Sequence, residues 1–403
     1  MYPLLKGLRI VDITTIVLGP YATQILADMG AEVIKIETIA GDMNRAVGPH
    51  GAPGIGTIFV NNNRNKRSLA VDLKQEAGKD VLRRLIETAD ALVHNMRQDA
   101  LDRLGFGWEA VHALNPKLVY CAGLGYGSDG PYAGKPAYDD IIQASGGIAG
   151  LTERRDGAPA YHPTVTADKV GALHIVYAVL GALLHRERNG GQGQLVEMPM
   201  FEAIASFALN EHLMGASFSP DGSTGYHRVM SRERRPYKTK DGWIALLPYT
   251  VAQWTRVLTA LGREDIVAEP WFTSDTERSK KSGDLYAVLH ASLGDRTSTE
   301  WLALFEELDV PCGPVNSMES LLTDPHLTAV GFFEPTYGGG PVHRSLRQPV
   351  LWRGIACEQD AMAPAVGADT AAILTELGYG AAEQAALAEQ RAIAGPKAGT
   401  GGA

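Results

Sequence analysis

One carboxylate stands out among the side chains that could do covalent chemistry. Asp168 heads a long apolar segment, 168–188 (DKVGALHIVYAVLGALLHRER), and directly follows the short run HPTVTA. An aspartate at the start of a helix commonly caps it. The apolar run before it also indicates partial burial, and a desolvated carboxylate held beside helix amides suits a nucleophile. The residue types alone leave capping and nucleophilic catalysis open.

A second concentration of polar chemistry lies in 61–67 (NNNRNKR), where three cations stand among four amides. Arg offers a planar fork and Lys a compact charge to phosphate oxygens. From the segment alone a solvated edge loop is the favoured interpretation, and a phosphate clamp is the functional one. The net charge of −9 gives such a basic cluster more weight.

A glycine-rich stretch, 125–136 (GYGSDGPYAGKP), ends just before the run Tyr138, Asp139 and Asp140. Two carboxylates after a glycine loop suit a ligand site. They suit the N-terminus of a helix equally well, because its dipole favours negative charge.

Nicotinamide and metal chemistry lack their usual patterns. The first predicted strand is followed by TTIVLGP (14–20), with one glycine where a dinucleotide fingerprint needs three. Cys121, Cys312 and Cys357 are far apart, without CxxC or Cys/His spacing. We therefore expect no nicotinamide cofactor, no metal site and no disulfide framework.

Alternating strands and helices must position these residues. Apolar runs predict strands, and amphipathic stretches predict helices at 20–29 and 75–88. The predicted strands cover 8–12, 32–37, 68–73, 91–93 and 118–122. Strands that alternate with helices imply an α/β fold with a parallel, doubly wound sheet. The segment 168–188 predicts one long helix with a buried middle.

A length of 403 residues suggests two or three domains. Around 217–235 the composition shifts to Ser, Gly, Pro and Arg, after which 238–250 (KTKDGWIALLPYT) predicts a hairpin and 251–261 a helix. We place a large domain at 1–200, a linker at 201–225 and a smaller domain at 226–325. The segment 326–403 is expected to return and complete the large domain, ending in a flexible tail.

The acidic balance argues against a general nucleic-acid or membrane-surface binder, since the pI is near 5.7. The N-terminus MYPLLKGLRIVD lacks a signal-peptide core, and the longest apolar run, 170–184, is broken by His174 and short for a bilayer. We expect a cytoplasmic protein with a small-molecule partner.

Several longer motifs make the chain recognisable. They include GLRIVDITTIVLGPYATQILADMGAEVIKIE, NRNKRSLAVDLK, LDRLGFGWEAVHALNPKLVYC, GYGSDGPYAGKPAYDDIIQASGG and ADKVGALHIVYAVLGALLHRERNGGQGQLVEMPMFEA. Because these motifs occur in this order, the chain resembles the class III CoA-transferases, the family that includes formyl-CoA transferase and carnitine CoA-transferase. The resemblance implies a Rossmann-like large domain, a smaller α+β domain, and a homodimer of two chains threaded as interlocked rings.

The resemblance also assigns roles to residues. It places the catalytic aspartate at Asp168 and implies transfer of CoA from an acyl-CoA thioester to a small mono- or dicarboxylic acid. The steps pass through an Asp168 acyl anhydride and an aspartyl-CoA thioester. The implied contacts with CoA, including neighbouring cations, are Ile16, Val17, Leu18, Asn62, Asn63, Arg64, Asn65, Lys66, Arg67, Asn95, Met96, Arg97, Arg103, Lys135, Ala137, Tyr138, Asp139 and Met200.

The chain departs from the family pattern in ways that bear on the substrate. Thr38 stands where some members carry an arginine, and Pro136 where formyl-CoA transferases carry a lysine, with Lys135 one place earlier. The glycine run of those enzymes is missing from 232–243 (RERRPYKTKDGW), so oxalate is not the expected acceptor. A basic stretch could instead hold the distal carboxylate of a dicarboxylic acid or form a solvated loop; its members are Arg228, Arg232, Arg234 and Arg235.

Two other functions stay open at this point. The similar α-methylacyl-CoA racemases use a histidine together with the aspartate, and here Tyr138 takes the place of that histidine. An ordinary phenol, which titrates at about 10, is a poor base near neutral pH, and this disfavours a racemase. The second alternative is a CoA-binding protein without turnover.

Overall fold

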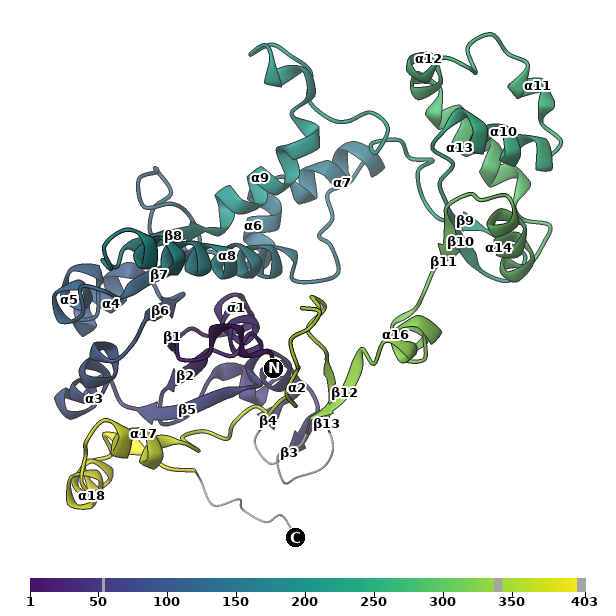
Figure 1. The fold of residues 1–403 in the computed structure, drawn as a ribbon. Coiled ribbons are helices and arrows are strands. Elements are labelled where there is room, and N and C mark those ends of the chain that lie inside the picture. The colour runs from purple at the N-terminus through teal and green to yellow at the C-terminus, as the bar shows by residue number, and fades with distance from the viewer. Residues whose placement is uncertain (53–54, 337–342, 397–403) are drawn as a thin grey trace. The chain divides into compact units, whose positions relative to one another are not determined.

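A seven-stranded sheet forms the centre of the first of two units into which the chain divides (Figure 1). The computed structural model describes residues 1–52, 55–336 and 343–396. The first unit comprises Met1–Gly147, His162–Phe207 and Thr328–Ala403. Its strands follow the order β14 (Ile393–Ala394), β5 (Lys66–Val71), β2 (Glu32–Glu37), β1 (Arg9–Ile13), β6 (Ala91–His94), β7 (Val119–Leu124) and β8 (Leu195–Pro199). Neighbouring strands are parallel except β14, which runs antiparallel to β5, so the predicted α/β fold with a parallel sheet is confirmed.

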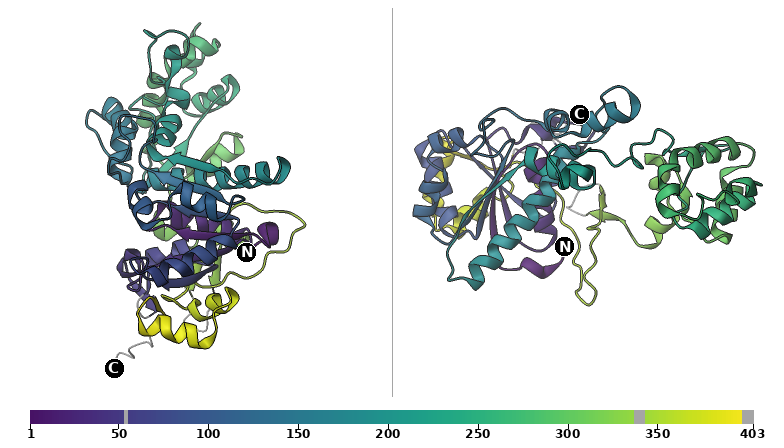
Figure 2. Two further views of the ribbon diagram at one scale, coloured as in Figure 1. Left: turned by 90° about the vertical axis from the view of Figure 1, so that its left-hand side faces the viewer. Right: turned by 90° about the horizontal axis from the view of Figure 1, so that it is seen from above.

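Helices cover both faces of this sheet (Figure 2). Alternate side chains of each strand point to opposite faces, so Val11 and Ile13 share one face of β1 while Asp12 lies on the other. The face of Val11 packs against α3 (Glu76–Glu87) and its neighbours in one apolar cluster. The remaining helices of this layer are α4 (Gln98–Leu104), α5 (Trp108–Leu114), α17 (Thr370–Glu376) and α18 (Ala381–Glu389).

On the other face, α1 (Leu18–Asp28) packs against α8 (Thr166–Arg188), which also contacts β7 and β8. By length and composition alone α8 could cross a membrane. Its contacts with α1 and two strands make it a core helix here, as the predicted helix at 168–188 requires. The smaller elements of the unit are α2 (Thr57–Asn63), α6 (Asp139–Ser145), β3 (His50–Ala52), β4 (Ile55–Gly56), β12 (Phe333–Thr336) and β13 (His343–Leu346).

The second unit comprises Ile148–Tyr161 and Ala208–Leu327. Its antiparallel sheet has the order β11 (Cys312–Pro314), β10 (Trp243–Leu246) and β9 (Tyr237–Lys238). An apolar core around Trp254, Tyr286 and Trp301 joins this sheet to helices, so the unit is α+β. The helices include α7 (Ile148–Asp156), α10 (Val251–Ala260), α11 (Glu264–Val267), α12 (Asp275–Lys280), α13 (Ser282–Ser292), α14 (Ser298–Glu307), α15 (Met318–Leu321) and α16 (Pro325–Ala329), the last of which runs into the first unit.

The predicted hairpin at 238–250 and helix at 251–261 are confirmed by β9, β10 and α10. The predicted boundaries need correction in two places. A helix, α9 (Met200–His212), occupies the first half of the expected linker, because its apolar residues continue the core. The segment 148–161, expected in the large domain, belongs to the second unit. The tail that we expected to fray is 394–403; its first residue, Ala394, pairs with β5 as part of β14, and 397–403 lie outside the described residues.

Candidate active site

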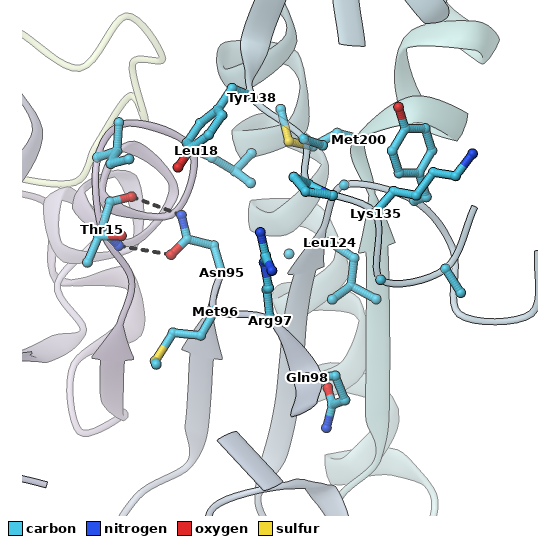
Figure 3. A pocket seen from close by; sticks show the side chains of 18 of the residues that line it. Thr15, Leu18, Asn95, Met96, Arg97, Gln98, Leu124, Lys135, Tyr138 and Met200 are labelled. Atoms are coloured by element: carbon cyan, nitrogen blue, oxygen red, sulfur yellow. Dashed lines mark hydrogen bonds between the residues drawn. The ribbon is translucent and has the colours of Figure 1, made fainter. Parts of the chain in front are cut away.

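A cavity of about 730 Å³ opens at the carboxyl ends of the central strands of the first unit (Figure 3). It is lined by the segments that follow β1, β6 and β7. Chain order along the sheet reverses between β1 and β6, and open parallel sheets place ligand crevices at such a point. The topology therefore puts the cavity where this class of fold binds ligands.

A strained turn after β1 forms one wall of the cavity. Ile16 has φ of 71°, a left-handed conformation that a β-branched residue adopts only when its surroundings hold it. The Asn44 amide donates to the Ile16 carbonyl at 2.6 Å. Asn95, after β6, accepts from the Thr15 N–H at 2.9 Å and donates to the Thr15 carbonyl at 2.8 Å (Figure 3). These two amide side chains fix the turn against the next strand.

Two cations lie on the wall of the cavity. Figure 3 shows Arg97 in the middle of the site and Lys135 on the opposite loop. Lys135 Nζ stacks 4.1 Å from the centre of the Tyr132 ring, and the Arg97 side chain is exposed. Such a pair can hold the phosphate groups of a ligand.

Asp168 contributes a carboxylate to the same cavity. It lies in the first turn of α8, is half-buried, and lines the cavity. Burial and the nearby charge of Asp139 together raise its pKa from 3.8 to about 7. A carboxylate with a raised pKa in a cleft is a typical nucleophile or base.

Asp139 stands behind Asp168 rather than on the cavity wall. Its Oδ1 accepts the backbone N–H of Asp168 at 3.0 Å, and its Oδ2 accepts from the Gln143 amide. The Gln143 carbonyl oxygen in turn accepts the His162 N–H at 2.9 Å. Asp139 is thus tied to the start of α8, where it fixes the backbone of Asp168.

Glycine is required at one point of the wall. A Cβ on Gly125 would lie 2.4 Å from the Cβ of Ala137, closer than two carbon atoms can approach. Only glycine therefore lets the loop after β7 pack against the segment that carries Lys135 and Tyr138.

The structure brings most of the predicted site residues together. Those that line the cavity with Asp168 are Ile16, Val17, Leu18, Asn95, Met96, Arg97, Lys135, Ala137, Tyr138 and Met200. Arg103 does not line it; its guanidinium pairs with Asp99 at 2.7 Å on the exposed side of α4. Of the two departures, Pro136 lies on the wall and Thr38 does not. Sequence reasoning missed Thr15 and Asn44, whose hydrogen bonds join distant segments, and the lining residues Gln98, Asp99 and Asp102.

The six residues from Asn62 to Arg67 lie away from the cavity. Lys66 is fully buried, and its Nζ meets Asp12, Thr23, Asn63 and the Pro20 carbonyl at 2.8–2.9 Å. We call Lys66, Asp12, Arg64 and Asp28 the buried ionic cluster.

The other polar groups of this stretch also have internal partners. Arg64 forms two hydrogen bonds with Asp28, and Arg67 pairs with Glu32 and Glu376. The side-chain amides of Asn62 and Asn63 donate to carbonyls of α2, and that of Asn65 donates to Asp28 and Asp360. The expected phosphate clamp is therefore corrected: these groups hold the fold together, and the cations are already neutralised.

Among the described residues, no group of three His, Cys, Asp or Glu side chains is placed to hold a metal ion. The charged groups on the cavity wall are three carboxylates, Asp99, Asp102 and Asp168, and two cations, Arg97 and Lys135.

Known proteins with similar sequences and structures cover nearly the whole chain. Residues 5–370 match the model of CoA-transferase family III. A succinate–glutarate CoA-transferase of Agrobacterium fabrum (strain C58 / ATCC 33970) is 31% identical over 388 residues, covering 93% of this chain and 96% of that protein. A formyl-CoA:oxalate CoA-transferase of Escherichia coli O157:H7 (strain EC4115 / EHEC) is 31% identical over 421 residues, covering 96% and 99%. The crystal structure of a CAIB/BAIF family protein from Brucella suis matches with a TM-score of 0.80 at 30% identity, covering 94% of this chain and 100% of that one.

Proposed function

This chain belongs to CoA-transferase family III, and from that premise we propose that Asp168 carries CoA from an acyl-CoA thioester to a free carboxylic acid. The observation that carries the proposal is the half-buried carboxylate of Asp168 on the cavity wall, beside a second carboxylate and with a pKa of about 7. At that pKa a large fraction of Asp168 is ionised at neutral pH, and desolvation makes the ionised form more reactive.

The reaction divides into balanced exchanges at the Asp168 carboxylate. An Asp168 oxygen attacks the thioester carbonyl, the C–S bond breaks, and a mixed anhydride and the CoA thiolate result. The thiolate then attacks the aspartyl carbonyl and releases the donor acid, leaving an aspartyl-CoA thioester. The acceptor carboxylate attacks this thioester, and the thiolate finally takes over the acceptor acyl group and frees Asp168. Each step exchanges one acyl–heteroatom bond for another and needs no external oxidant or base.

The cavity suits CoA as the substrate. Arg97 and Lys135 supply positive charge for the phosphates of CoA. The fixed turn at 15–18 and the glycine-rich segment at 123–128 bring backbone N–H groups close to the ligand. Such groups can stabilise the oxyanion that forms in every exchange.

The acceptor is proposed to be a small mono- or dicarboxylic acid. Similar proteins are described as succinate–glutarate and formyl-CoA:oxalate CoA-transferases, so carboxylic acids are the shared substrate class. Oxalate remains disfavoured, because 232–243 lacks a glycine run.

A homodimer is also part of the proposal. Leu173, Tyr177 and Leu184 lie at helical spacing on α8, and all three are exposed in the single chain. An apolar stripe of this kind on a core helix supports its burial by a second copy. The interlocked arrangement and a cytoplasmic location stay predictions.

The α-methylacyl-CoA racemase alternative lacks a histidine at the position where the similar racemases carry their second base. Tyr138 occupies the corresponding position, and Asp139 already accepts two hydrogen bonds that hold the α8 backbone. Racemisation requires two groups that take and return the α-proton from opposite faces. These observations favour transfer over racemisation.

Trapping with hydroxylamine tests the proposal directly. Enzyme treated with acyl-CoA and then hydroxylamine should carry a hydroxamate at Asp168, located by peptide mass spectrometry, and lose activity in parallel. Matched samples without acyl-CoA should stay unmodified. An unmodified Asp168 under turnover would reject the covalent mechanism. Incorporation of α-deuterium into an α-methylacyl-CoA in deuterium oxide would then identify a racemase, and no turnover with any acyl-CoA would identify a binding protein.

A further inference from the structure

A second cavity, of about 540 Å³, lies entirely within the second unit. Its walls combine aromatic and apolar side chains with charged and hydroxyl groups in about equal measure. The lining includes Tyr226, Arg228, Tyr249, Val251, Ala252 and Tyr286. Concave sites that combine apolar walls with fixed polar groups commonly bind small molecules.

Arg228 is the fixed polar group of this pocket. Its Nε donates to the Tyr286 hydroxyl at 3.0 Å, and its guanidinium lies 4.7 Å from the centre of the Tyr249 ring. Both contacts orient the planar fork while leaving its charge unneutralised. No carboxylate in the described part of the chain forms an ion pair with Arg228.

The other charges of the pocket cancel one another. Arg278 is buried, donates to the Phe272 carbonyl at 2.9 Å, and pairs with Asp275. The lining therefore carries one net positive charge, that of Arg228. A ligand that neutralises this pocket brings a single negative group.

The start of α10 adds hydrogen-bond donors to the same wall. The Thr250 hydroxyl accepts the Gln253 N–H in a capping box. The Val251 and Ala252 N–H groups, one and two places into the helix, have no acceptor within it. Both residues line the pocket, and the positive end of the helix dipole reinforces the charge of Arg228.

The structure separates Arg228 from the three other arginines of its basic stretch. Arg232 donates its Nε to the Arg155 carbonyl at 2.7 Å, and Arg235 approaches Glu233 at 3.5 Å. Neither these two nor Arg234 lines the pocket. Only Arg228 combines a fixed fork, an unneutralised charge and a cavity.

We propose that this pocket binds the carboxylate group of a small organic acid with an apolar or aromatic body. The carboxylate pairs with the Arg228 fork and the first N–H groups of α10, and the body packs on the tyrosine rings. A monocarboxylate fits better than a dicarboxylate, because the pocket offers one unneutralised cation. The site goes beyond the proposed transfer chemistry and does not depend on Asp168 being the nucleophile.

Fluorine NMR of the full-length protein with para-fluorobenzoate as the probe tests this site. We expect saturable binding of para-fluorobenzoate and at least about tenfold weaker binding of the neutral para-fluorobenzamide, since a charged hydrogen-bonded pair is lost. Arg228→Met should weaken benzoate binding by a similar factor. The matched variant Arg235→Met removes the same charge from an exposed site and should bind like the wild type.

Two further variants keep the test decisive. If Arg228→Met does not fold, Arg228→Lys keeps the charge but loses the fork and should still weaken binding severalfold. Asp168→Ala should bind the probe normally, because the pocket lies in the other unit. No benzoate binding, equal binding of the amide, or binding lost in Asp168→Ala but kept in Arg228→Met would overturn the proposal. Hydroxamate trapping at Asp168 is an independent readout, so failure of either proposal is recognised separately.

Discussion

The Asp168 cavity and the buried ionic cluster use the same kinds of residue for opposite purposes. In the cluster, Lys66 and Asp12 are fully buried at 2.9 Å, and hydrogen-bond partners surround them. Burial alone would raise the pKa of Asp12, but Lys66, Lys35 and two threonine hydroxyls outweigh it and lower the pKa to about 2. At Asp168 burial is joined by the charge of another carboxylate in place of a cation, and the pKa rises to about 7. The paired charges of Lys66 and Asp12 stabilise the fold, whereas the unpaired carboxylate of Asp168 is available for chemistry.

Removing the nucleophile should give the largest effect. Asp168→Asn is nearly isosteric but cannot form an anhydride, so we expect CoA-transfer activity to fall by at least ~10³-fold. The variant should fold and keep its affinity for CoA, because Asp168 contributes its backbone N–H to Asp139, and no side chain in the described part of the chain donates to its carboxylate. Steady-state transfer assays and CoA titration measure both quantities. Full activity in a sample shown by mass spectrometry to be free of deamidation would show that Asp168 is not the nucleophile, and the two regions would then not differ in function as proposed.

Breaking the buried ionic cluster should affect stability instead of binding. Lys66→Met leaves Asp12 buried without its partner, which should lower the free energy of unfolding by about 3–5 kcal/mol. The neighbouring Arg67→Met, whose pairs are partly exposed, should cost about 1 kcal/mol or less. Denaturant unfolding measures the difference. If Lys66→Met instead weakened CoA binding at unchanged stability, the interpretation of 61–67 as a phosphate clamp would be correct after all.

A single cation on the cavity wall should show the reverse pattern. Arg97→Met should weaken CoA binding by about tenfold with little change in unfolding, because the side chain is exposed and forms no ion pair with a carboxylate in the described part of the chain. The loss should shrink at high salt, since the interaction is with phosphates. Arg188→Met, at the exposed end of α8, is the matched control. Equal CoA affinity in both variants would show that Arg97 does not contribute to CoA binding.

The sequence predicted most of the elements that carry the site. The strand expected at 32–37 is found at Glu32–Glu37, and the helix at 75–88 is found at Glu76–Glu87, because apolar periodicity is strong in both. The strand expected at 68–73 begins at Lys66 instead. A charged residue normally indicates solvent, and the partner that buries Lys66 is 54 positions away in Asp12.

For the candidate site, too, the sequence predicted local features but not contacts between distant segments. Asp168 followed from a resemblance and from its place before an apolar helix, both of which are local features. The Thr15–Asn95 hydrogen bonds span 80 positions, and four of the five residues of the strand β8 are not buried, so neither leaves a local pattern. Pairing between distant segments decides which charges are neutralised, and only the fold reveals it.

The smallest expected effect is on stability and comes from the same carboxylate that controls activity. The pKa of Asp168 is raised in the folded protein, so its folded state binds more protons than its unfolded state between about pH 4 and 7. The stabilising contribution of Asp168 is therefore complete below about pH 4 and is lost as the pH rises through 7. Asparagine does not titrate, so Asp168→Asn should match the wild type at acidic pH and become more stable above pH 7. We expect a gain on the order of 1 kcal/mol after allowance for solvent screening. Unfolding curves at pH 4 and pH 8 measure it, with Asp140→Asn, an exposed neighbour, as the control. A loss of stability at pH 8 would mean that Asp168 is neutralised after all, and the distinction between the two regions would fail at its most important residue.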